Sequence, residues 1–213
     1  MYTHQKNIIT AGRPIMEAKR AIIFIHGRGA SAEDILSLNN HLKIEDAALF
    51  APQATNSSWY PYSFMAPVKD NQPSLDSALA VIKDLVSDIE NAGIPKEQIY
   101  FIGFSQGACL TLEYMTRNAS KYGGAVALTG GLIGKEINMQ NYKGDFKQTP
   151  VLITTGDPDP HVPVSRVELS EGIMKKMNAS VTVKIYPGRP HTITKIEIEL
   201  AKKLVFNITK KIT

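Results

Sequence analysis

The chain has 213 residues, of which 43% are hydrophobic and 21% charged, and its formal net charge is +4. This length suffices for one domain with a sizeable core and is short for two, so we expect one domain over residues 1–213. The basic excess consists of short pairs such as Lys175-Lys176 and Lys202-Lys203. Such pairs are typical of solvated helix faces and argue against a nucleic-acid surface.

The amino-terminal residues and the single cysteine bear on location. Residues 1–10 contain neither an apolar core nor a small-residue cleavage site. No apolar run approaches the roughly 20 residues that a membrane-spanning helix needs. Cys109 has no second cysteine with which to form an intrachain disulfide. We therefore expect a cytoplasmic protein without a membrane span.

The first part of the chain alternates strand-like and helical patterns. Residues 6–10 and 14–18 are compatible with an edge hairpin, and a fully apolar strand follows at 21–25. Ser31 is expected to cap a helix that ends near His41, and a second strand follows at 47–51. Residues 52–73 hold four prolines and the only tryptophan, without a clear period. They predict a long surface loop.

The alternation continues to the end of the chain. Ser74 is expected to cap a helix with one apolar face, which Gly93 and Pro95 end. Further strands are expected at 99–102, 125–128, 151–155 and 181–186, and further helices at 105–117, 164–177 and 192–206. This order predicts an α/β fold with a mostly parallel sheet and helices on both faces.

Ser105 lies in a G-x-S-x-G pattern, Gly103-Phe104-Ser105-Gln106-Gly107, between a strand and a helix. A serine hydroxyl is a weak nucleophile that needs exposure and a base, and a sharp strand-to-helix turn supplies the exposure. The helix start also brings backbone N–H groups and a positive dipole end beside the serine. An ordinary helix-capping serine is the alternative, but the context favours a nucleophile.

The base is expected among the histidines that follow the serine, because proteins with this turn order the site as nucleophile, acid, histidine. Only His161 and His191 follow Ser105. His161 shares a short loop with the candidate acids. His191 follows the strand at 181–186 and opens the last expected helix, and reactive groups of such folds lie after strands. We therefore expect His191 to be the base, with a surface histidine at a helix start as the alternative.

The acid is expected in the loop Gly156-Asp157-Pro158-Asp159-Pro160-His161-Val162-Pro163. One carboxylate suffices to hold the histidine tautomer, and spacing does not separate Asp157 from Asp159. A third interpretation makes Asp157, Asp159 and His161 metal ligands, but no other cluster in the sequence completes such a site.

An oxyanion hole needs two N–H donors. The residue after the nucleophile, Gln106, should supply one, and the loop His26-Gly27-Arg28-Gly29 the other, through the backbone of Arg28. His26 is expected to anchor this loop, and Cys109 to be a buried helix residue.

The aromatic residues of the long loop lie close together in the sequence. They either line an apolar pocket or pack the loop itself. For Trp59 both readings are open, and for its neighbours we expect packing; these neighbours are Tyr60, Tyr62, Phe64 and Met65.

These segments resemble the carboxylesterase/phospholipase family of small α/β-hydrolases, which includes acyl-protein thioesterases and compact bacterial esterases. The resemblance covers nearly the whole chain from Ala21 onward. It rests on Ile25-His26-Gly27-Arg28-Gly29, Ala51-Pro52, Trp59-Tyr60, Gly103-Phe104-Ser105-Gln106-Gly107, Gly156-Asp157-Pro158-Asp159-Pro160-His161-Val162-Pro163 and His191-Thr192-Ile193.

The resemblance implies an α/β-hydrolase fold without a large cap domain. It selects Asp159 as the catalytic aspartate, implies Arg28 and Gln106 as oxyanion donors, and places Trp59 in the acyl pocket. The family usually has leucine where this chain has Arg28, and often histidine where it has Thr155. The Arg28 side chain is therefore expected to add a positive group near the pocket mouth.

We expect a serine carboxylesterase that cleaves small or medium-chain esters through an acyl-enzyme and needs no metal or organic cofactor. A thioesterase or lysophospholipase of the same family is the nearest alternative. A peptidase is disfavoured because nothing resembles a substrate-gating domain, and a non-catalytic ligand receptor because all three triad residues are present. The expected partner is a small-molecule ester, and the sequence leaves a homodimer open.

Overall fold

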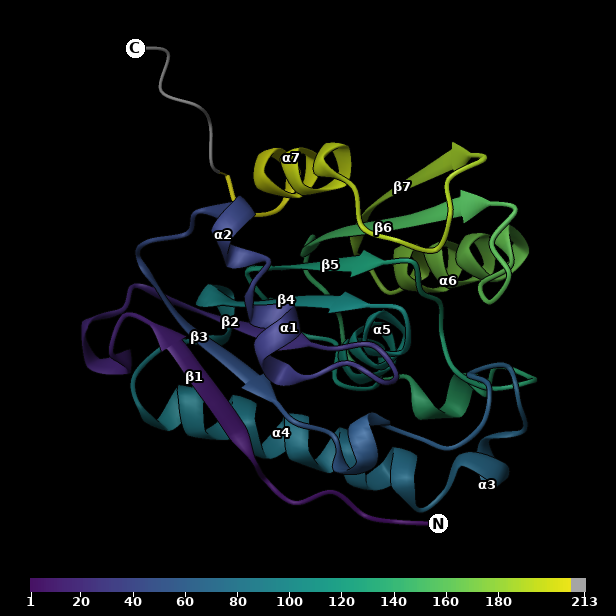
Figure 1. Ribbon diagram of the computed structural model, residues 1–213, viewed down its shortest axis with the longest axis horizontal. Helices are drawn as coiled ribbons and strands as arrows, with labels where there is room; N and C mark the ends of the chain where they lie inside the picture. Colours follow the sequence, from purple (N-terminus) through teal and green to yellow (C-terminus); the bar gives the residue numbers. More distant parts are fainter. Residues whose placement is uncertain (208–213) are drawn as a thin grey trace.

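A seven-stranded sheet forms the centre of the computed structural model, which describes residues 1–207; residues 208–213 of the expected domain lie outside the described part. The strand order is β1-β3-β2-β4-β5-β6-β7 (Figure 1). Strands β2 to β7 are parallel, and β1 is antiparallel to β3. The strands are β1 Ile8–Gly12, β2 Arg20–Ile25, β3 Ala47–Pro52, β4 Ile99–Phe104, β5 Gly124–Leu128, β6 Pro150–Asp157 and β7 Ser180–Pro187.

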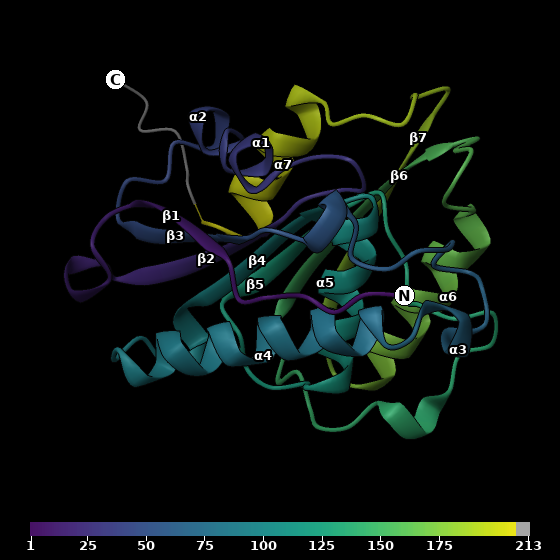
Figure 2. The same cartoon turned by 60° about the horizontal axis from the view of Figure 1, so that its bottom comes forward.

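Helices cover both faces of this sheet, as Figure 2 shows. One face carries α4 Ser74–Asn91, α5 Gln106–Arg117 and α6 Val164–Lys176, and the other carries α1 Ala32–Leu36, α2 Asn39–Leu42 and α7 Lys195–Leu204. The short α3, Val68–Asn71, lies in the segment between β3 and α4. The predicted α/β fold with helices on both faces is confirmed. Within residues 1–207, no helix is both long enough and apolar enough to cross a membrane.

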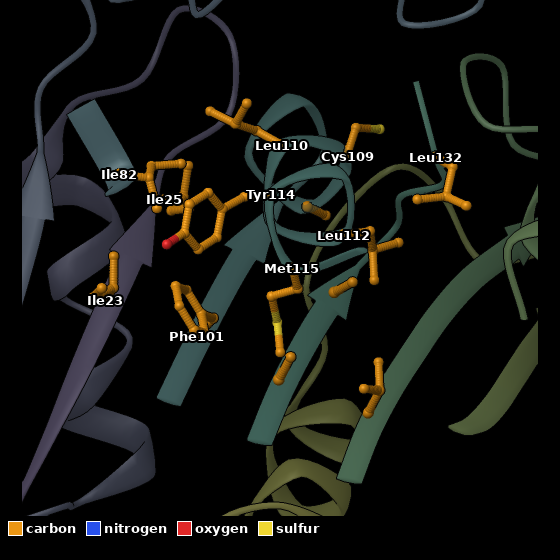
Figure 3. Close-up of a cluster of buried hydrophobic side chains, with 14 of the residues drawn as sticks. Ile23, Ile25, Ile82, Phe101, Cys109, Leu110, Leu112, Tyr114, Met115 and Leu132 are labelled. Atoms are coloured by element: carbon orange, nitrogen blue, oxygen red, sulfur yellow. The ribbon is translucent and has the colours of Figure 1, made fainter. Parts of the chain in front are cut away.

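Helix α5 lies in the core, and all its residues from Gln106 to Thr116 are buried. Its side chains pack against β2 and β4 (Figure 3), where the rings of Phe101 and Tyr114 are 5.8 Å apart. Because a close-packed core resists displacement, this packing fixes the start of α5, and Ser105 immediately precedes that start.

The amino-terminal strand does not form the expected hairpin. Strand β1 adds to the edge of β3, with Ile8 opposite Pro52 and Gly12 opposite Ala48. Residues 14–18 contain a 3-10 turn, in which the N–H of Glu17 donates to the carbonyl of Pro14 at 2.9 Å. The hairpin prediction is wrong because Pro14 has no N–H for a ladder and favours a turn.

Two helices also differ from the expectation. The helix expected from Ser31 to His41 is divided into α1 and α2, and at the division Ser37 Oγ donates to the Asp34 carbonyl at 2.6 Å, competing with helical bonding. Ser31 caps α1 as predicted. Ser74 does not cap α4, because its hydroxyl donates to the Tyr2 carbonyl at 2.6 Å and ties the amino-terminal segment to this helix.

Candidate active site

Ser105 occupies a strained turn between β4 and α5, as the G-x-S-x-G pattern predicts. Its backbone has φ 54° and ψ −117°, a region that residues with a side chain rarely adopt. A Cβ at Gly103 would overlap the backbone of Gly107, and a Cβ at Gly107 would overlap the carbonyl of Ile25. Both glycines therefore allow the close approach that this turn requires.

His191 lies between Ser105 and Asp159. Its Nε2 is 2.8 Å from Ser105 Oγ, and its Nδ1 is 2.8 Å from Asp159 Oδ2. Since an ionised carboxylate only accepts hydrogen bonds, Nδ1 donates to Asp159 and Nε2 is free to accept the serine proton. The histidine is in the loop after β7 and precedes α7, whose start is three residues later than expected, with Thr194 as its cap.

Asp159 is held as a carboxylate by three donors. Its Oδ1 accepts from the N–H groups of His161 and Val162, both at 2.9 Å, while Oδ2 faces His191. Burial raises the pKa of Asp159, but the bonds from His191 and the two N–H groups outweigh burial, so its pKa lies below the ordinary value. The acid is thus ionised at neutral pH.

The structure separates the two aspartates that spacing left equal. Asp157 is exposed at the end of β6, whereas the Asp159 side chain has no exposed surface. Among residues 1–207, no three or more His, Cys, Asp or Glu side chains are grouped to hold a metal ion. The two carboxylate oxygens of Asp159 instead accept hydrogen bonds from the N–H groups of His161 and Val162 and from the His191 ring.

Arg28 and Gln106 flank Ser105 in the lining of one cleft. Gln106 is the first residue of α5, where a backbone N–H has no carbonyl four residues earlier in the helix to bond. Its side chain bonds the segment that follows β3: Oε1 accepts from the Trp59 N–H at 2.8 Å, and Nε2 donates to the Tyr60 carbonyl at 2.9 Å. This anchoring fixes the orientation of Gln106 beside the serine.

The Arg28 guanidinium bonds the same segment. Nη1 donates to Ser58 Oγ at 3.0 Å and to the Pro61 carbonyl at 2.9 Å. Nη2 donates to the carbonyls of Tyr60 at 2.9 Å and Tyr62 at 2.8 Å. All four Nη hydrogens therefore have acceptors within the protein. The expected positive group is present at the cleft, but it serves as a clamp on residues 58–62.

The cleft beside Ser105 has a volume of about 530 Å³. It lies at the carboxyl ends of the parallel strands, where α/β sheets place their ligands, and the loops after β2, β3, β4, β6 and β7 all contribute to it. Aromatic and apolar side chains form much of its lining, together with the site residues; the apolar and aromatic ones are Ala30, Tyr60, Pro61, Tyr62, Phe64, Phe104, Pro160 and Val162.

Trp59 does not line this cleft, which corrects the pocket prediction. Its side chain is fully buried, and Nε1 donates to the His26 carbonyl at 2.9 Å. Its neighbours Tyr60, Tyr62 and Phe64, for which packing was expected, are the ones that line the cleft. Burial of the large indole surface favours this inward position, and the buried N–H then needs an acceptor, which the sequence does not identify.

His26 and Cys109 have the structural roles that were expected. The Ala54 N–H donates to His26 Nε2 at 3.1 Å, so the ring proton is on Nδ1, which bonds the Gly27 carbonyl at 2.8 Å. These bonds anchor the loop that carries Arg28. Cys109 is buried, and burial raises its thiol pKa to about 12. Its thiolate is therefore not populated at neutral pH.

The fold and the site define an α/β-hydrolase with a serine, histidine and carboxylate in hydrogen-bonding contact. A model of the phospholipase/carboxylesterase family matches residues 6–208. The chain belongs to this family, whose name describes hydrolases of ester bonds.

Individual relatives agree with this assignment. The crystal structure of a phospholipase/carboxylesterase from Dyadobacter fermentans is 64% identical, covers 97% of this chain and 99% of its own, and has a TM-score of 0.96. Acyl-protein thioesterase 1 of Debaryomyces hansenii is 28% identical over 91% of this chain and 93% of its own length. The carboxylesterase of Bacillus cereus, 20% identical over 92% of this chain and 91% of its own with a TM-score of 0.76, shares the fold.

Proposed function

We propose that this protein hydrolyses carboxylic esters through an acyl-enzyme on Ser105, with His191 as base and Asp159 as the acid of the triad. The observation that carries the proposal is the pair of 2.8 Å contacts that joins the serine hydroxyl, the imidazole and the carboxylate in order. A base within hydrogen-bonding distance is what activates a serine, and the carboxylate holds its tautomer.

The reaction follows from these contacts. His191 Nε2 takes the proton of Ser105 Oγ while the oxygen attacks the ester carbonyl carbon, and the carbonyl electron pair moves to its oxygen. The N–H groups of Arg28 and Gln106 stabilise that oxyanion, each by about 3 kcal/mol by analogy with other hydrolases. As the carbonyl re-forms, the C–O bond to the alcohol breaks, and His191 gives its proton to the alcohol. Water then replaces Ser105 by the same steps.

The substrate class in this proposal is small or medium-chain esters. The cleft of about 530 Å³ and its apolar lining support a small-molecule ester as substrate. The second candidate is thioester hydrolysis, which the acyl-protein thioesterase 1 names of several relatives favour. The same triad would serve either bond, because both reactions pass through an acyl-serine.

The test compares Ser105→Ala with the unmodified protein on p-nitrophenyl acetate and butyrate. We expect the variant to lose turnover and keep its circular dichroism spectrum. Turnover like that of the unmodified protein in Ser105→Ala would overturn the proposal. A panel of p-nitrophenyl esters of increasing acyl length, run beside acyl-CoA and an S-acyl peptide, separates the ester from the thioester candidate. Absence of Ser105 labelling by a fluorophosphonate probe would instead favour a non-catalytic ligand receptor.

A further inference from the structure

The loop that carries His191 crosses from the carboxyl end of β7 to the start of α7 (Figure 2). Its first residues are held by the main chain: the Gly188 N–H donates to the Asp157 carbonyl at 2.8 Å, and the Arg189 N–H to the Tyr186 carbonyl at 3.2 Å. Nearer His191, the Thr192 N–H bonds only within the loop, to the Pro190 carbonyl at 2.8 Å. The part with the histidine therefore depends on side chains for its position.

The Arg189 side chain supplies these bonds. Nη1 donates to the carbonyl of Pro190 at 3.1 Å and to the carbonyl of Thr192, the two residues that flank His191. Nη2 donates to Thr129 Oγ1 at 2.7 Å, just beyond β5. One guanidinium thus joins both sides of the histidine to the carboxyl end of a central strand.

A buried carboxylate anchors Arg189 from α7. The Arg189 and Glu197 side chains are 3.7 Å apart and are 5% and 0% exposed. Glu197 is itself fixed, because Oε1 accepts from Thr154 Oγ1 at 2.5 Å and Oε2 from the Thr194 N–H at 2.9 Å. Ion pairs without access to water are held in one arrangement, since separating the charges leaves each unpaired in the interior.

The backbone of Arg189 also contacts the loop that carries the acid. A Cβ at Gly156 would overlap the Arg189 carbonyl oxygen, so only glycine allows this approach. Gly156 precedes Asp159 by three residues. The loop of the base and the loop of the acid therefore meet at Arg189.

We propose that Arg189 is a positioning residue for His191, a role that rests on the proposed function. The imidazole must keep two contacts of 2.8 Å at once, to Ser105 and Asp159, and small displacements of a base cost large factors in rate. The rings of Phe104 and His161, 5.2 and 5.0 Å from the His191 ring, limit its tilt. Arg189 fixes the main chain from which that ring projects.

The first test replaces Arg189 by methionine and counts active sites by titration, so that kcat refers to folded enzyme. We expect kcat for p-nitrophenyl butyrate to fall at least tenfold while KM changes less than about twofold. Arg189→Lys should recover part of the loss, because an ammonium can still donate to one of the flanking carbonyls.

A matched control removes an arginine from the opposite end of the sheet. Arg20 forms an ion pair with Asp46 and donates to the Phe206 carbonyl at 3.1 Å, at the amino end of β2. Arg20→Met loses the same charge and a similar set of bonds, and we expect its kcat per titrated site to be unchanged. An equal fall of kcat in both variants would overturn the positioning role of Arg189.

A spectroscopic readout separates positioning from stability. In the unmodified protein, the His191 proton shared with Asp159 should give a downfield proton NMR signal. This signal should be absent in Asp159→Asn and broadened or removed in Arg189→Met.

A second variant keeps the inference testable if Arg189→Met does not fold. Thr129→Val removes one acceptor of Arg189 at similar volume and should give a smaller fall in kcat. If Arg189→Met folds and retains both the downfield signal and kcat, the inference is overturned.

The proposed function and this inference fail in distinguishable ways. If the unmodified protein lacks ester turnover, or His191→Ala retains it, the proposed function is wrong whatever Arg189 does. If His191→Ala is inactive and Arg189→Met has normal kcat, only the positioning role is wrong.

Discussion

Arg28 Nη2 donates to the Tyr60 carbonyl oxygen at 2.9 Å. This bond joins the loop of one proposed oxyanion donor to the segment whose aromatic residues, Tyr60, Tyr62 and Phe64, line the cleft. The same carbonyl accepts from Gln106 Nε2 at 2.9 Å and from Ser58 Oγ at 3.0 Å. The two residues proposed to hold the oxyanion by their N–H groups therefore share an anchor. The Tyr60 carbonyl therefore couples the aromatic lining of the cleft to the proposed oxyanion donors.

Arg28→Leu tests this coupling, because it keeps the backbone N–H and removes all four guanidinium bonds. We expect kcat/KM for p-nitrophenyl butyrate to fall about tenfold, which corresponds to about 1.4 kcal/mol of transition-state stabilisation. Arg28→Lys keeps the charge without the planar fork and should lose nearly as much. Full activity in Arg28→Lys would mean that the charge, and not the clamp, matters.

Substitutions at Trp59 and Tyr62 should affect different properties. The first should lower stability, and the second should change substrate preference. Trp59→Phe leaves the buried His26 carbonyl without its indole donor, so the free energy of unfolding should fall by about 1–3 kcal/mol with unchanged preference among esters. Tyr62 lines the cleft and is 57% exposed. Tyr62→Ala should alter KM across an ester panel and leave stability within about 0.5 kcal/mol. Urea unfolding measures the change in stability, and the ester panel measures the change in KM. A changed ester preference in Trp59→Phe together with lost stability in Tyr62→Ala would instead indicate that Trp59 contacts the substrate.

The sheet could be predicted from the sequence because fully buried parallel strands are continuous apolar runs, such as residues 21–25 and 99–102. The pairing of the edge strand β1 with β3 could not be predicted, because the residues of β1 alternate weakly and its partner is distant in the chain. The division between α1 and α2 depends on a local hydroxyl–carbonyl bond of Ser37, which leaves no periodic signal.

The candidate site was partly predictable for a similar reason. Chain order and strand ends are readable, so His191 could be selected over His161. Asp157 and Asp159 are two residues apart, and only the three-dimensional course of the loop, or family resemblance, separates them. The Arg189–Glu197 pair was not found, although an arginine two residues before the candidate base is a signal that could have suggested it.

His26 should make stability depend on pH. Burial lowers its pKa below 6.5, and the bond to the Gly27 carbonyl opposes burial only in part; burial lowers the pKa of His4 in the same way. The unfolded chain then binds these protons more tightly than the folded protein. Their contribution to stability is therefore complete above pH 6.5 and declines as pH falls through the lowered folded pKa values.

Urea unfolding at pH 7.5, 6.5 and 5.5 measures this dependence. We expect the midpoint of the unmodified protein to fall mainly between pH 6.5 and pH 5.5, and to change little between pH 7.5 and pH 6.5. In His26→Asn the absolute stability should be lower but the decline with pH smaller. Asp159 does not interfere, because its lowered pKa confines its titration to more acidic solutions. Equal stability at the three pH values would show that these histidines are protonated equally easily in the folded and unfolded states.

Asp159→Asn and Asp157→Asn form a matched pair two residues apart in one loop. An amide at 159 can donate to His191 Nδ1, so the tautomer that leaves Nε2 able to accept the Ser105 proton is lost, and kcat should fall by about 10³–10⁴. Asp157 is exposed, and its replacement should leave kcat unchanged. Steady-state kinetics on p-nitrophenyl butyrate measures both variants, with circular dichroism to establish folding. A large loss in Asp157→Asn together with activity in Asp159→Asn would assign the acid to the other aspartate, despite the 2.8 Å contact between Asp159 and His191.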